Sequence, residues 1–153
     1  MESNNKAQID SLNNLIQINN DRIQGYVTAA NETEDGELKA VFSELMQTSQ
    51  DCRRELSQEV TRMGGEPIEG TTVSGKFYRA WMDVKSALSA KDRKAVLNSC
   101  EFGEDVAVKT YESELEGDKL GTLRSLVEGQ YTKIKAGHDK IKQLRDAENA
   151  KAA

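Results

Sequence analysis

Residues 97–115 read LNSCEFGEDVAVKTYESEL, and their apolar side chains recur with the three- and four-residue steps of an amphipathic helix. The stripe consists of Leu97, Cys100, Ala107, Val108, Tyr111 and Leu115. Glu104 stands where another apolar side chain would complete the pattern. A carboxylate there is a metal ligand, a hydrogen-bonded structural acid, or a side chain that reaches water at the edge of the stripe. These three interpretations predict different proteins.

The same periodicity predicts three further long helices, over about 5–30, 34–63 and 119–147, while the opening stretch belongs to a helix over about 92–116. Short polar turns, NETEDGE (31–37) and EGDKLG (116–121), join these helices into two antiparallel hairpins. The segment 64–75 contains four glycines and the only proline, so it breaks the helical pattern and forms a long connection. A short helix follows at about 75–89.

These elements predict an all-α protein, an antiparallel four-helix bundle with an extra short helix in the crossover between the second and third long helices. The length of 153 residues fits a single domain over 1–153, with a core of about 5–147 and a C-terminal tail that frays.

Composition narrows the range of partners. The net charge of -5 argues against nucleic acid, and no segment approaches the apolar length of a membrane span or shows the pattern of a secretory signal. The two cysteines, Cys52 and Cys100, lie on apolar stripes, so we expect free thiols in a reducing, cytoplasmic compartment. A disulfide between them is the alternative, and it needs Cα atoms within about 7 Å.

Each long helix carries a polar interruption in its stripe: Asn19, Ser49, Glu104 and Gln130. Residues equally distant from a hairpin turn lie at equal depth, so turns near 34 and 118 pair Asn19 with Ser49 and Glu104 with Gln130. If both turns lie at one end of the bundle, the four form a polar core layer. The amides and the hydroxyl would then donate hydrogen bonds to Glu104, Glu104→Gln would be tolerated, and Glu104→Ala would cost about 1–3 kcal/mol.

Several runs carry a resemblance to a known family: CEFGEDVAVKTYESEL (100–115), GGEP (64–67), WMDVKSAL (81–88) and QYTKIKAGHDKIKQLRD (130–146). Over about residues 8–147 the chain resembles an uncharacterised bacterial family of ferritin-like four-helix-bundle proteins, a domain of unknown function. The resemblance implies a ferritin-like fold, assigns no reaction, and links some relatives loosely with stress responses.

The ligand set of a ferritin-like di-iron centre is not complete here. Such a centre takes one Glu from each of two helices and a Glu-x-x-His from each of the other two. The first helix offers Asn19, the second reads Ser49-Gln50-Asp51-Cys52, and the fourth reads Lys135-Ala136-Gly137-His138. With one histidine in the chain, a standard di-iron site within one subunit is not expected, and no catalytic residues are assigned.

The leading hypothesis is therefore a non-enzymatic bundle without a cofactor, which acts by self-association, as a homodimer, or through an unidentified protein partner. The alternative is a metal-binding or redox protein with iron or another divalent metal, whose candidate ligands are Glu104, His138, Glu101 and Glu55. His138 is also explained as a boundary histidine hydrogen-bonded to a neighbouring helix. Gly137, in a helix interior, predicts close packing by a bulky partner, with Trp81 or Tyr78 as candidates.

Overall fold

The computed structural model describes the backbone of residues 2–70 and 76–152 and the side chains of residues 5–70 and 82–151. Its elements are α1 (Glu2–Glu32), α2 (Gly36–Arg62), α3 (Lys76–Ser89), α4 (Arg93–Leu115), a 3-10 turn η1 (Gly121–Leu123) and α5 (Arg124–Ala152). All regular structure in these ranges is helical, and the prediction of four long helices and one short helix is confirmed. The bounds agree within two residues, except at the start of α1 and at both ends of α5.

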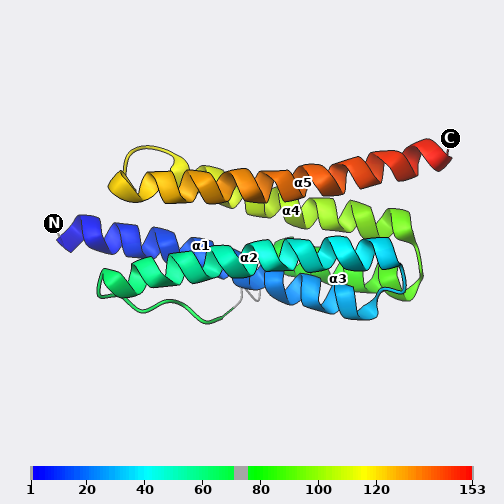
Figure 1. The fold of residues 1–153 in the computed structure, drawn as a ribbon, viewed down its shortest axis with the longest axis horizontal. Helices are drawn as coiled ribbons and strands as arrows, with labels where there is room; N and C mark the ends of the chain where they lie inside the picture. The colour runs from blue at the N-terminus through cyan, green and yellow to red at the C-terminus, as the bar shows by residue number, and fades with distance from the viewer. Residues whose placement is uncertain (1, 71–75, 153) are drawn as a thin grey trace.

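The long helices form two antiparallel hairpins, α1 with α2 and α4 with α5 (Figure 1). Figure 1 shows the α1–α2 turn at one end of the bundle and the α4–α5 turn at the other. The two turns therefore do not share an end, as a single polar layer would have required. The connection after α2 and the short helix α3 together return along the bundle, and α3 packs against α4 and α1.

Local sequence explains where the helices begin and end. Asp35 and Asp92 are N-caps, and their carboxylates accept hydrogen bonds of 3.1 Å from the backbone N–H groups of Leu38 and Ala95. At the end of α3 the chain turns through Lys91, whose φ of 56° is left-handed. The N–H of Lys91 bonds the carbonyl of Leu88, and that of Asp92 bonds the carbonyl of Ala87, which is the pattern of a Schellman cap.

At the other end of the chain, α5 continues to Ala152, five residues beyond the expected limit of the core. Glu148, in this last part of α5, accepts a 2.7 Å hydrogen bond from Arg93 Nε at the start of α4. Arg93 also pairs with Asp35 and Glu37, so one guanidinium ties three helices together at this end of the bundle.

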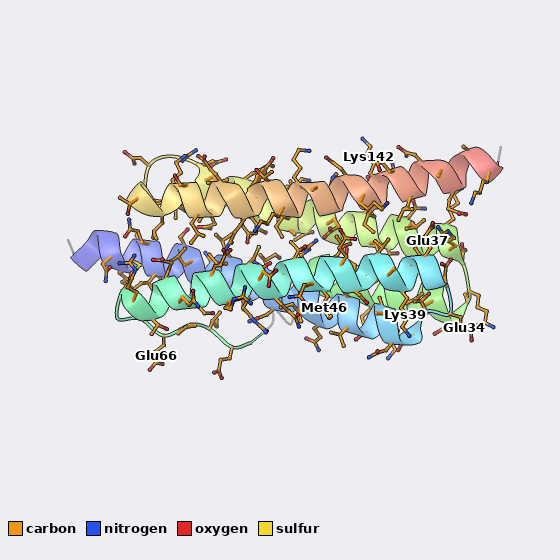
Figure 2. The ribbon with its side chains drawn as sticks, in the orientation of Figure 1. Glu34, Glu37, Lys39, Met46, Glu66 and Lys142 are labelled. Carbon is orange, nitrogen blue, oxygen red and sulfur yellow. The ribbon has the colours of Figure 1, made fainter. Side chains whose placement is uncertain are left out.

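Two hydrophobic clusters fill the interior, one in each half of the bundle. The first, toward the α4–α5 turn, includes Leu12, Leu15, Ile16, Leu56, Tyr111, Leu120, Val127 and Ile134. The second, toward the α1–α2 turn, includes Tyr26, Leu38, Phe42, Leu45, Val84, Leu97, Cys100 and Ile141. Charged side chains such as Glu66 and Lys142 project from the outside (Figure 2). None of the described helices contains a stretch long and apolar enough to cross a membrane.

Candidate functional site

A buried ion pair joins α1 to α4 between the two hydrophobic clusters. Arg22 Nε donates to Glu104 Oε2 and Arg22 Nη2 donates to Glu104 Oε1, both at 2.7 Å. Both side chains are 0% exposed. The third donor nitrogen, Nη1, lies 2.6 Å from Ser49 Oγ on α2. This two-pronged geometry is the strongest form of a carboxylate–guanidinium pair, and it connects three of the four long helices.

The surroundings favour the charged form of Arg22 and the neutral form of its aromatic neighbour, Tyr26. Burial disfavours the charged guanidinium, but the carboxylate of Glu104 outweighs it, so the pKa of Arg22 is raised. Burial and then the charge of Glu104 raise the pKa of Tyr26 well above its ordinary value. The Arg22 guanidinium carbon lies 5.6 Å from the centroid of the Tyr26 ring, which stacks on Phe42 at 5.5 Å between centroids.

A second polar network lies on the side of the ion pair toward the α4–α5 turn. Asn19 Nδ2 donates to Tyr111 Oη at 2.8 Å, and Tyr111 Oη donates to Gln130 Oε1 at 2.9 Å. Gln130 Nε2 donates to the carbonyl of Cys52 and to Glu55 Oε1, at 3.2 and 3.0 Å. The chain of bonds crosses all four long helices, and Asn19, Tyr111 and Gln130 are buried.

The ion pair and Ser49 come from α1, α2 and α4, and Gly137 on α5, the fourth long helix, faces the pair. A Cβ added at Gly137 would lie 2.7 Å from Leu45 Cδ2, 3.1 Å from Arg22 Nη2 and 3.2 Å from Glu104 Oε1. The prediction of a close neighbour is confirmed, but the neighbours are Leu45 and the ion pair. The side chains of Tyr78 and Trp81 lie outside the described residues. A groove of about 580 Å³ between α2 and α5 is also lined by Gly137 and Leu45, yet the pair beneath them has no exposure.

The four predicted polar residues are all buried, so the interpretation in which Glu104 reaches water is wrong. The predicted pairing of Glu104 with Gln130 is also wrong, since Gly137 faces Glu104 and Tyr111 faces Gln130. The reason is that the turn centre lies near residue 120 or 121, because η1 lengthens the connection, and not near 118. The donors expected for Glu104 were amides and a hydroxyl, whereas both oxygens accept from Arg22.

Arg22 is the residue that the sequence patterns missed. In the sequence, steps of four and three residues place Asn19, Ile23 and Tyr26 on one stripe of the first helix, but in the structure Ile23 is half-buried and Arg22 is fully buried. Steps of three and four residues fit Asn19, Arg22 and Tyr26 equally well. A buried carboxylate is most often paired with a cation, so Arg22 was the partner to consider for Glu104.

The four candidate metal ligands fall into three places. Glu104 is bound by Arg22, and Glu55 belongs to the network of Gln130. Only Glu101 and His138 come together, on the outer face of the α4–α5 hairpin, where they are joined by Asp105. His138 Nε2 lies 2.5 Å from Asp105 Oδ1. This is the one group of three potential metal ligands found among the described residues.

The cysteines offer no reactive group at neutral pH. Cys52 and Cys100 are buried free thiols, as predicted. Burial raises the pKa of Cys52 to about 11, and burial followed by the charge of Glu104 raises the pKa of Cys100 further. Because the thiolate is the nucleophile and metal ligand, both cysteines act as small core residues.

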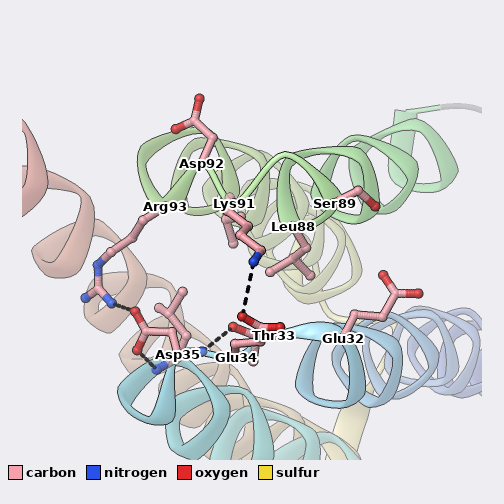
Figure 3. Close-up of a pocket in the computed structure, with 11 residues that line it drawn as sticks. Glu32, Thr33, Glu34, Asp35, Leu88, Ser89, Lys91, Asp92 and Arg93 are labelled. Carbon is pink, nitrogen blue, oxygen red and sulfur yellow. Dashed lines mark hydrogen bonds and ion pairs between the residues drawn. The ribbon is translucent and has the colours of Figure 1, made fainter.

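A pocket of about 490 Å³ lies at the α1–α2 turn, between that turn and the turn from α3 to α4 (Figure 3). Lys91 and Glu34 pair across it at 3.5 Å, and both are largely exposed. Arg93 pairs with Asp35 on its far side (Figure 3). Its lining carries four acidic and two basic side chains, all of them exposed or half-buried, so solvent screens the net negative charge.

The chemistry available at these places differs. Both Glu104 oxygens accept from Arg22 and the side chain is 0% exposed, so a metal ion or a substrate could reach Glu104 only if the ion pair opened. The two charged groups of the interior are therefore bound to each other. The potential metal ligands that solvent can reach lie on the outer face of the α4–α5 hairpin.

Comparison with known proteins adds a family but no activity. A comparison with curated proteins found no significant match. One family model matches residues 7–117, a segment that contains Arg22, Ser49 and Glu104 and ends before α5, with Gln130 and His138. The matched segment is well over half of the chain, and the chain belongs to this family, which is described as a domain of unknown function (DUF2383).

Proposed function

We propose that this protein is a non-enzymatic helical bundle that acts through its outer surface, by self-association or by binding another protein. The observation that carries the proposal is the bidentate Arg22–Glu104 pair, which uses both oxygens of the central acid inside a closed core. A centre that has its own internal cation needs no metal, and a centre without exposure admits no substrate.

The proposed architecture is ferritin-like. Two antiparallel hairpins joined by one long crossover agree with that class of bundle. In its metal-binding members, inward carboxylates from the four helices surround cations at mid-bundle. At the corresponding depth this chain has Arg22, Ser49, Glu104 and Gly137, so the guanidinium takes the place of the metal charge.

For the surface, we propose a homodimer formed over α3 and α4. Met82 on α3 and Phe102 on α4 are 46% and 47% exposed, although both are large and apolar. Counted from the ends of α3 and α4 at the turn that joins them, Met82 and Phe102 differ in depth by about two residues, or about 3 Å. Two such side chains on adjacent helices make the centre of an apolar patch that association would bury.

Sedimentation velocity from micromolar to about 100 µM chain tests this proposal. The wild type should form reversible dimers, and the double variant Met82→Ser/Phe102→Ser should stay monomeric with unchanged helix content. Ile68, which is 39% exposed in the connection after α2, supplies the control Ile68→Ser, which should dimerise like the wild type. A wild type that remains monomeric throughout this range would refute the dimer.

Other parts of the proposed role rest on simpler observations. The two buried free thiols support a reducing compartment such as the cytoplasm. The net charge of -5 supports a protein partner over nucleic acid or an anionic membrane. A bacterial, stress-related role is supported by the sequence resemblance alone. Metal binding is the second candidate function, and the cluster of Glu101, Asp105 and His138 favours it at a surface site.

A further inference from the structure

We propose that Glu101, Asp105 and His138 form a binding site for a divalent transition-metal ion of the Zn²⁺ type on the outer face of the α4–α5 hairpin. This site is separate from the buried ion pair and does not depend on the proposed dimer.

The helices bring the three side chains together by a simple geometry. Glu101 and Asp105 are one helical turn apart on α4, so they project from the same face. Because Gly137 faces Glu104, the next residue, His138, lies at a depth between the two acids. One potential ligand atom from each residue lies within 4.8 Å of the other two. The backbone therefore presents one imidazole between two carboxylates.

This arrangement is close to a coordination sphere. Zn–N and Zn–O bonds of about 2.0–2.2 Å at tetrahedral angles place ligand atoms about 3.4 Å apart. The distance from His138 Nε2 to Asp105 Oδ1 is 2.5 Å, and the widest separation in the cluster is within 4.8 Å. The first distance is about 1 Å shorter than 3.4 Å, and the second is longer than 3.4 Å by at most about 1.4 Å. Rotation of Glu101 and Asp105 about their side-chain bonds can correct both distances without moving the helices.

A fourth residue sets the orientation of the imidazole. Asp139 Oδ1 lies 3.2 Å from His138 Nδ1, on the side of the ring away from Asp105. With its Nδ1 proton donated to Asp139, His138 would offer the lone pair of Nε2 to a metal ion held by the two acids, and metal-bound histidines usually donate their other ring N–H to a carboxylate in this way.

Charge and access also suit a cation. Glu101, Asp105 and Asp139 bring three carboxylates to the site, against the guanidinium of Arg145, which pairs with Glu101 and Asp146, and Lys135, which pairs with Asp139 at 3.6 Å. An arriving metal replaces Arg145 at Glu101, while Arg145 keeps its 2.9 Å contact with Asp146. Asp105 is 45% exposed, so the site opens to solvent on its side. Three protein ligands leave a coordination position for water.

The test uses protein without a histidine tag, stripped of metal and titrated with Zn²⁺ against a chromophoric chelator. Co²⁺ serves as a second probe, because its visible absorption reports the ligand set. The wild type should bind one ion per chain. His138→Ala and Asp105→Asn should each weaken binding by at least about tenfold, and Asp139→Asn by about tenfold.

Two further variants separate a built site from general acidity. Arg145→Gln removes the competing cation and should strengthen binding, whereas Glu128→Gln, at an exposed pair on the same hairpin, should leave it unchanged. Circular dichroism must show that each variant is folded. Asp105→Asn is the variant least able to disturb the core, because the Asp105 side chain is 45% exposed. Binding that is equal in the wild type, His138→Ala and Asp105→Asn would overturn the site, as would no binding by the wild type. Sedimentation with and without a chelator then shows whether the metal and the dimer are independent.

Discussion

Breaking the buried ion pair on one side should cost more than removing it altogether. Arg22 and Glu104 are 0% exposed and joined by two hydrogen bonds of 2.7 Å. Charge centres about 4 Å apart attract one another by about 4 kcal/mol at the effective dielectric that suits protein sites. Either single removal also leaves the other charge buried without its partner, and the expected loss is about 3–5 kcal/mol.

The expected order of stabilities follows from this. Glu104→Gln keeps the shape of the side chain but leaves the Arg22 charge uncompensated, so it should lose about 3–5 kcal/mol and not be tolerated, contrary to what amide partners would have predicted. Arg22→Met should lose a similar amount. The double variant Arg22→Met/Glu104→Leu buries no charge, and it should be more stable than either single variant.

Urea unfolding followed by far-UV circular dichroism measures these differences, and a loss of about 4 kcal/mol should lower the Tm by about 8–16 °C in a chain of this length. Glu128→Gln provides the matched control, because the pair of Arg124 and Glu128 is about half exposed and should contribute less than about 0.5 kcal/mol. A Glu104→Gln variant within about 1 kcal/mol of the wild type would refute the reasoning, as would a double variant that shows the summed losses of the two singles.

Three further predictions concern positions where the backbone or burial is decisive. Gly137→Ala should destabilise by about 1–3 kcal/mol in urea unfolding because its Cβ overlaps Leu45, whereas Gly129→Ala, with open space around it, should stabilise by about 0.5–1 kcal/mol. The check is that these two substitutions change the free energy of unfolding in opposite directions. Lys91→Gly should raise the Tm slightly, by relieving the left-handed φ of 56°, and Lys91→Ala should not. Finally, because the pKa of Cys52 is raised from 9.0 to about 11, the unfolded thiol loses its proton first, and stability that is complete below pH 9 should fall between pH 9 and 11. Cys52→Ala should show a shallower fall in that window, and equal slopes would contradict the assignment.

The fold could be predicted because its signals repeat over long segments. The second helix shows this best: every apolar stripe position from Leu38 to Val60 is buried, and Ser49 and Cys52 are buried with them. A stripe sustained over about six turns fixes the helix and its inward face. The relative direction of the two hairpins, whose turns lie at opposite ends of the bundle (Figure 1), could not be predicted from the sequence. The apolar periodicity within a helix carries no information about which way its neighbours run.

The candidate site was predicted only in part, for the same physical reason. Burial of Glu104 followed from its place in the stripe, but its partner did not, since Arg22 and Ile23 fit the periodicity of the first helix equally well. An error of about three and a half residues in the centre of the hairpin, which doubles across it, then moved the partner of Glu104 from Gly137 to Gln130. Asp105 was missed because it lies beside the stripe, and only the packing of α5 on α4 brings His138 to it.

The position of the ion pair also suggests why a charge is kept in this core. The two hydrophobic clusters lie on either side of Arg22 and Glu104, and apolar contacts are non-directional, so they specify the offset of α1 along α4 less sharply than the ion pair does. A slide of one turn, about 5.4 Å, would separate the guanidinium from both carboxylate oxygens and leave two unpaired charges in a dry interior. We infer that the pair fixes the register between the two hairpins more than it adds stability. The double variant without the pair should therefore remain helical but lose a single well-ordered packing, which broadened amide resonances in an NMR spectrum would reveal. Sharp, fully dispersed resonances in that variant would show that apolar packing fixes the register without the pair.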